Sequence, residues 1–187
     1  MEMTGERLIA APKATVWKAL NDPQILKASI PGCEQIEVIS ETEMTASVAI
    51  KLGPISAKFA GRVKLSDIDP PNAYTLSGEG KGGPAGFAKG AAKVNLSEQS
   101  NGTLLRYTVE AQVGGKLAQL GARLIDTTAK SMADQFFNRF VEQVQPLAAP
   151  PAQAVAAEQS ERKYAKAVWI LLAIGVAIAV AGWFLAG

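Results

Sequence analysis

Residues 78–87 read Gly-Glu-Gly-Lys-Gly-Gly-Pro-Ala-Gly-Phe, and this run lies in the middle of a region whose side chains alternate with a period of two. Such alternation predicts β-strands with one wet face and one buried face. The wet face carries charged side chains, namely Lys58, Arg62, Lys64, Glu79, Lys81, Lys89, Lys93, Arg106 and Glu110. The other face is apolar but unusually small, and it includes Gly78, Gly80, Gly90, Ala92 and Ala111.

A buried face made of glycine and alanine leaves unfilled space beneath a curved sheet. Because protein interiors are packed to nearly crystalline density, something must occupy that space. Two interpretations remain open: a helix lies close against the sheet, or a ligand lies between the sheet and a helix. The glycines also have a structural explanation, since they permit a bulge or a tight bend in a strand.

The flanking sequence predicts further strands and two short helices. A first strand is expected over residues 3–9, a helix from Pro12 to Leu20, and a second helix over residues 23–28. Strands are then expected around residues 36–39 and over 44–52, 55–65, 74–80, 88–96 and 105–113. The breaks between them have turn chemistry, as in Asn101-Gly102.

After the strands, residues 116–144 predict one long amphipathic helix that ends before Pro146. Its apolar stripe recurs at helical spacing and consists of Leu117, Leu120, Leu124, Thr128, Met132, Phe136, Phe140 and Val144. One strand, two short helices, six antiparallel strands and a long helix together predict an α+β helix-grip fold. In that fold a curved antiparallel sheet wraps around the C-terminal helix and leaves a cleft between them.

The C-terminal residues differ in character from the rest of the chain. Residues 167–187 carry no charge, and as a helix they would span roughly 30 Å, the thickness of a bilayer core. Trp169 and Trp183 lie near the two ends, where interfacial aromatic residues are found, and basic residues precede the segment. We therefore expect a single-pass tail anchor over residues 164–187. The alternative, a buried helix of a soluble protein, is disfavoured because the segment is apolar all round.

The domain organisation follows from these assignments. Residues 1–146 are expected to form one ligand-binding domain, and residues 147–163 an Ala/Pro-rich linker. Because the basic residues lie on the N-terminal side of the anchor, the positive-inside rule places the domain on the cytoplasmic side of the cytoplasmic membrane.

Composition excludes several classes of function. A formal net charge of +2 and the absence of a basic block argue against nucleic-acid binding. The chain has no histidine, so Ser-His-Asp and Cys-His catalytic sets are impossible. The single cysteine, Cys33, excludes an internal disulfide and argues against a zinc site. Since Glu79 and Glu110 belong to the wet face, a pair of carboxylates in the cleft is not expected either. We predict no catalytic residue and no metal ligand.

An apolar cleft with a few polar groups is the usual form of a ligand site. A ligand tail is predicted to lie along Val48, Phe59, Val109, Leu117, Leu120 and Leu124, and a ring to meet the hydroxyl of Tyr107. Gly78 and Gly80 would supply the space, and Phe87 would gate the mouth of the cleft or touch a membrane. For each of these residues the alternative is ordinary core packing.

Several short motifs carry a family resemblance that covers roughly residues 3–145. They are Asp22-Pro23, Ile30-Pro31-Gly32-Cys33-Glu34, Gly53-Pro54-Ile55, Phe59-Ala60-Gly61, the Gly80–Phe87 run, Val113-Gly114-Gly115-Lys116-Leu117-Ala118 and Gly121-Ala122-Arg123-Leu124-Ile125. In this order they resemble the CoxG family, named for the G subunit of carbon monoxide dehydrogenase, within the START/polyketide-cyclase (SRPBCC) superfamily.

The resemblance implies a partner and a ligand. The partner is a molybdenum-containing carbon monoxide dehydrogenase or a related hydroxylase, recruited to membrane lipid, and the chain itself would not carry the molybdenum, flavin or iron–sulfur groups. The superfamily cavity suggests a lipophilic ligand, for which we favour a respiratory quinone (menaquinone or ubiquinone) and no covalently bound cofactor. The alternatives are a purely structural docking factor without ligand, and an enzyme of the polyketide-cyclase type.

Overall fold

The computed structural model describes residues 1–148, and the structural statements below concern these residues. In chain order the elements are β1 (Glu2–Ile9), α1 (Lys13–Leu20), α2 (Pro23–Ser29), β2 (Cys33–Ser40), β3 (Glu43–Leu52), β4 (Ile55–Asp69), β5 (Ala73–Lys81), η1 (Gly83–Ala85), β6 (Phe87–Gln99), β7 (Gly102–Gly114), η2 (Gly115–Leu120) and α3 (Ala122–Ala148).

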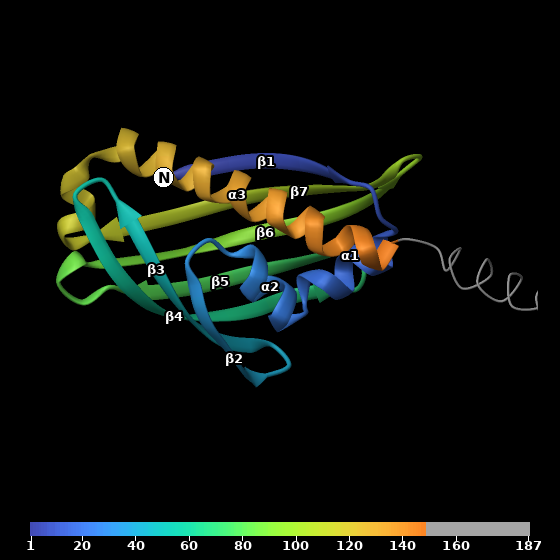
Figure 1. Ribbon diagram of the computed structural model, residues 1–187, viewed down its shortest axis with the longest axis horizontal. Coiled ribbons are helices and arrows are strands. Elements are labelled where there is room, and N and C mark those ends of the chain that lie inside the picture. The colour runs from blue at the N-terminus through green and yellow to red at the C-terminus, as the bar shows by residue number, and fades with distance from the viewer. Residues whose placement is uncertain (149–187) are drawn as a thin grey trace, which may run out of the picture. The chain divides into compact units, whose positions relative to one another are not determined.

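The strands form one antiparallel sheet in the order β1-β7-β6-β5-β4-β3-β2, so β1 and β2 are its edges. Figure 1 shows α3 lying across one face of this curved sheet, with α1 and α2 on the same side. The predicted helix-grip fold and its order of elements are confirmed.

Apolar side chains gather in two separate clusters. The main cluster joins α1, the sheet and the C-terminal half of α3, and its most buried members include Ile9, Val16, Leu105, Phe140 and Val144. A smaller cluster joins β4, η1 and η2 through Phe59, Ala85 and Leu117. The small-residue part of the sheet lies between the two clusters.

The long helix begins later than the apolar periodicity predicts. Residues 115–120 form a 3₁₀ turn, and α3 starts at Ala122. Gly121 between them has a φ of +84°, which belongs to no right-handed helix and favours glycine. The predicted start at residue 116 is therefore wrong. At the other end α3 includes Pro146 and runs to Ala148, beyond the predicted end.

Two glycines of the 78–87 run have a structural role. A Cβ on Gly82 would lie 2.5 Å from the ring of Phe59, and Gly86 has a φ of +115°. The backbone can therefore turn through η1 and close over Phe59 only because these positions lack side chains. The interpretation of these glycines as a tight bend is confirmed here.

The predicted tail anchor, with Trp169 and Trp183, lies outside the described residues, as does the predicted linker beyond Ala148. The proposed domain boundaries stay predictions. Between residues 1 and 148, no helix combines the length and apolar character that a membrane span requires.

Candidate functional site: an apolar cavity between sheet and helix

A cavity of about 390 Å³ lies between the sheet and α3, on the inner face of the strands. All seven strands contribute to its floor, which includes Val63, Leu76, Ala92 and Val109. Met132, Ala133, Phe136 and Phe137 of α3 form the opposite wall, and α2 closes one side with Leu26. None of the lining residues carries a charge. This volume falls within the range of about 300–1,000 Å³ that small-molecule sites occupy.

The cavity exists because small residues face it from opposite sides. Ala92 sits in register between Leu76 of β5 and Val109 of β7, and Ala133 faces it from α3. Alanine at these positions leaves the helix and the sheet separated by more than their side chains fill. Of the two interpretations of the small inner face, the helix over the sheet is confirmed (Figure 1). A cavity remains between them, and a ligand in it stays a prediction.

Two tyrosines, Tyr74 and Tyr107, are the lining residues that carry a side-chain hydroxyl. Tyr74 of β5 is buried against the edge of Trp17, with ring centroids 5.6 Å apart, and Tyr107 of β7 stacks on Phe137 at 5.2 Å. Burial raises the pKa of Tyr74 from its ordinary value of 10 to about 12, so this phenol keeps its proton well into the alkaline range. A protonated phenol donates a hydrogen bond, and a carbonyl oxygen of a ligand is its natural acceptor.

Replacing Tyr74 with phenylalanine is expected to change how stability depends on alkaline pH. The pKa of this phenol is about 12 in the folded protein and falls to its ordinary value of 10 in the unfolded chain, so unfolding releases a proton between these pH values. The wild type should therefore lose about 2–3 kcal/mol more stability than Tyr74→Phe as pH rises through this window. Urea unfolding of both proteins below pH 10 and near pH 12 measures the difference. Parallel losses in the two proteins would show that Tyr74 ionises freely in the folded state.

The residues predicted to bind a ligand do not all lie at the cavity. Tyr107 and Val109 line the cavity. Phe59 and Leu117 are buried in the smaller cluster, and Leu120 packs against it.

The other predicted residues lie elsewhere. Val48 of β3 is half-buried and lies in register beside Phe59 of the neighbouring strand β4. Phe87 and Leu124 are exposed by 42% and 38%. A Cβ on Gly80 would meet nothing nearer than 3.9 Å, so its surroundings are open, whereas one on Gly78 would lie 2.9 Å from the carbonyl oxygen of Arg62. Ligand contact by any of these residues stays a prediction.

Several cavity residues were not predicted as ligand contacts, although the alternation placed some of them on the correct face. Tyr74 shares its strand face with Leu76, and Met132 and Phe136 belong to the predicted stripe of the long helix. Alternation shows which side chains of a strand face inward, but it does not show which of them border a cavity. Only the crossing position of α3 reveals which part of the inner face remains uncovered.

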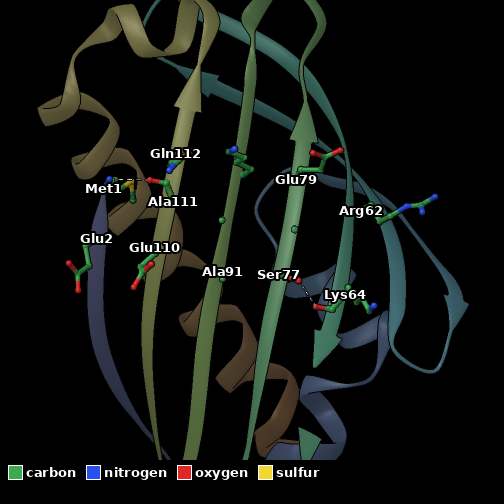
Figure 2. Close-up of a pocket in the computed structure, with 13 residues that line it drawn as sticks. Met1, Glu2, Arg62, Lys64, Ser77, Glu79, Ala91, Glu110, Ala111 and Gln112 are labelled. Atoms are coloured by element: carbon green, nitrogen blue, oxygen red, sulfur yellow. Dashed lines mark hydrogen bonds between the residues drawn. The ribbon is translucent and has the colours of Figure 1, made fainter. Parts of the chain in front are cut away.

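A second, larger hollow of about 860 Å³ lies on the outer face of the sheet. Figure 2 shows charged side chains of both signs around it, including Arg62, Lys64, Glu79 and Glu110. The two glutamates therefore lie on the outer face, as the alternation predicts. Because this hollow is open and charged, solvent suits it better than a lipophilic molecule does, and the inner cavity is the candidate site.

Comparison with known proteins agrees with the fold. Residues 5–145 match the family described as the G subunit of carbon monoxide dehydrogenase (CoxG). A conserved protein from Geobacillus kaustophilus is 32% identical, with a TM-score of 0.73, and the match covers 77% of this chain and 95% of that one. A START superfamily protein from Mycobacterium smegmatis has a TM-score of 0.61 at 11% identity, covering 78% and 98% of the two chains. Among curated proteins, none matches the chain.

Proposed function

The chain belongs to the CoxG family of carbon monoxide dehydrogenase proteins, and we propose that it is an accessory protein that binds a respiratory quinone. In this proposal it brings a molybdenum carbon monoxide dehydrogenase or related hydroxylase to the membrane. The electron-transfer cofactors belong to that enzyme. The bound quinone accepts two electrons from it, together with two protons, and leaves as the quinol.

The observation that carries the proposal is the uncharged cavity with two tyrosines among its lining residues. A quinone is an apolar ring with two carbonyl oxygens, and both carbonyls are hydrogen-bond acceptors. In this proposal the hydroxyl of Tyr74 or of Tyr107 donates a hydrogen bond to a ring carbonyl in an otherwise apolar site. The apolar wall contributes the larger part of the affinity, because each buried CH₂ group is worth ~0.8 kcal/mol.

The size of the cavity bears on how the ligand is held. A site of about 390 Å³ encloses a compact molecule, whereas a polyprenyl tail is long. We therefore place the ring and the first part of the tail in the cavity. The remainder would continue along the small inner face toward Gly80, where the sheet is open. This arrangement leaves part of the ligand free to enter or leave a bilayer.

The proposal is tested by identifying what the full chain carries. The protein is purified from membranes in detergent, extracted with organic solvent, and the extract analysed by mass spectrometry beside a mock purification with the same detergent. We expect about one quinone per chain in the protein sample only. Menaquinone and ubiquinone are then added back separately to protein freed of ligand, to show which is retained.

Two results would contradict the proposal. An extract that stays free of quinone after incubation with either compound would remove the ligand role and favour the purely structural docking factor. A different stoichiometric lipid would keep a lipid-binding site but overturn the electron-transfer role.

A further inference from the structure

Three segments far apart in the sequence meet at one end of the domain, which we call the loop end. It consists of residues 49–60, 80–90 and 112–124, around the β3–β4 turn, η1 and η2. The smaller apolar cluster joins these segments, and Gly53 lies beside Leu124 at the start of α3. Figure 1 shows the loop end opposite the end of the domain where α3 finishes.

The three segments of the loop end carry positive charge only. Its three segments contain six basic residues and no acidic one, namely Lys51, Lys58, Lys81, Lys89, Lys116 and Arg123. Since the whole chain has a formal charge of +2, the rest of the chain carries −4. All six side chains are exposed. Residues 33–43, by contrast, contain four glutamates and no basic residue.

Internal salt bridges neutralise only part of this charge. Lys58 pairs with Glu34 at 2.6 Å and Lys81 with Glu79 at 3.7 Å. Among residues 1–148, no acidic side chain forms a salt bridge with Lys51, Lys89, Lys116 or Arg123. These four cations are therefore available to an anionic surface outside the domain.

Large apolar side chains are exposed among the cations. Phe87 at the start of β6 is 42% exposed, and Leu124 in the first turn of α3 is 38% exposed. Phe87 lies opposite Lys81 in the sheet, and Leu124 follows Arg123, so apolar side chains and cations occur together at the loop end. This combination suits an anionic bilayer surface, in which phosphates lie above the acyl chains. Each basic residue near such a surface strengthens the attraction.

We propose that the loop end rests on an anionic lipid bilayer, with Phe87 and Leu124 at the level of the headgroups and the unpaired cations on lipid phosphates. The length of the chain permits this orientation. The 15 residues between Ala148 and Tyr164 could span up to ~50 Å, about the length of the 15-residue strand β4. The predicted anchor and the loop end could therefore reach the same membrane. The proposal concerns membrane contact and holds whether or not the cavity binds quinone.

The test places a probe at the loop end and a matched probe at the far end of β4. In a Cys33→Ser background, Phe87→Cys and, separately, Ile68→Cys are labelled with an environment-sensitive fluorophore. Ile68 is 41% exposed, nearly the same as Phe87, but it lies at the opposite end of the strands. The full chain is incorporated into phosphatidylcholine–phosphatidylglycerol vesicles that contain a headgroup nitroxide quencher, and circular dichroism checks that each variant is folded.

We expect several-fold stronger quenching at position 87 than at position 68. The difference should shrink in pure phosphatidylcholine, at high salt, and in the double variant Lys116→Glu/Arg123→Glu, because screening or reversing charge weakens the attraction. Equal quenching at the two positions would overturn the proposal. So would quenching at position 87 that is the same in pure phosphatidylcholine as in vesicles that contain phosphatidylglycerol. So would a label at position 87 that stays unquenched on vesicles and is shielded only by an added protein partner.

Discussion

Replacing Ala92 with leucine is expected to weaken quinone binding by at least about tenfold, equivalent to about 1.4 kcal/mol. Ala92 lies on the cavity floor between Leu76 and Val109, opposite the wall formed by α3. The added carbon atoms occupy space that the ligand ring needs. Because the added side chain enters a cavity, it should cost the folded state little. The dissociation constant of added quinone, measured on protein freed of ligand, reports the effect.

The neighbouring residue provides the matched control. Ala91 belongs to the same strand, but its side chain points to the outer face, where it borders the charged hollow (Figure 2). Ala91→Leu adds the same carbon atoms and should leave quinone affinity unchanged. Ala133→Leu adds them from the helix side and should weaken binding as Ala92→Leu does. If folded Ala92→Leu and Ala133→Leu both bind quinone with wild-type affinity, the ligand does not occupy this cavity.

Truncating Phe140 to alanine is expected to lower the free energy of unfolding by about 3–5 kcal/mol. Its side chain has no exposed surface and lies in the main cluster with Val16 and Val144. It also stacks on Phe136, which lines the cavity, with ring centroids 5.6 Å apart. The loss combines the transfer energy of the ring with the cost of the space it leaves. Urea unfolding followed by circular dichroism, in one detergent for all variants, measures the difference.

The adjacent residue Arg139 is exposed, so Arg139→Ala should change stability by no more than about 0.5 kcal/mol. A loss below about 1 kcal/mol in Phe140→Ala would mean that α3 does not pack against the sheet as described. The quinone affinity of Phe140→Ala should also fall where the variant stays folded, because Phe136 loses the ring that holds it.

The two buried clusters have different roles in the domain. The main cluster ties α3 to the sheet and shares residues with the cavity wall, including Tyr74, Leu105 and Phe137, whereas the smaller cluster closes the turns at the loop end. Between them the inner face is built of small residues such as Gly78 and Ala92. Part of the cavity wall is therefore the core itself, so changes in the main cluster are expected to affect both stability and ligand binding.

Much of the fold could be predicted because its signals are local. Strict alternation in 44–52 and 55–65 reflects the period of a strand, and Phe136 and Phe140 recur at the spacing of a helix. The error at the start of the long helix has a local cause as well. Leu117 and Leu120 continue the helical stripe, but they pack into the smaller cluster from a 3₁₀ turn. Periodicity alone does not distinguish the two kinds of helix.

The sequence by itself determined that a sheet of small inner residues faces a long apolar helix, since side-chain alternation and volume are properties of the chain. It also determined that the cleft would lack histidine and a carboxylate pair. Only the tertiary structure decided where the space lies. The crossing of α3 leaves Tyr74, Ala92 and Ala133 around the cavity, whereas Phe59 and Leu117 bury each other at the loop end. The reason is physical: an empty volume results from the distance between elements, and that distance depends on every contact that holds them apart.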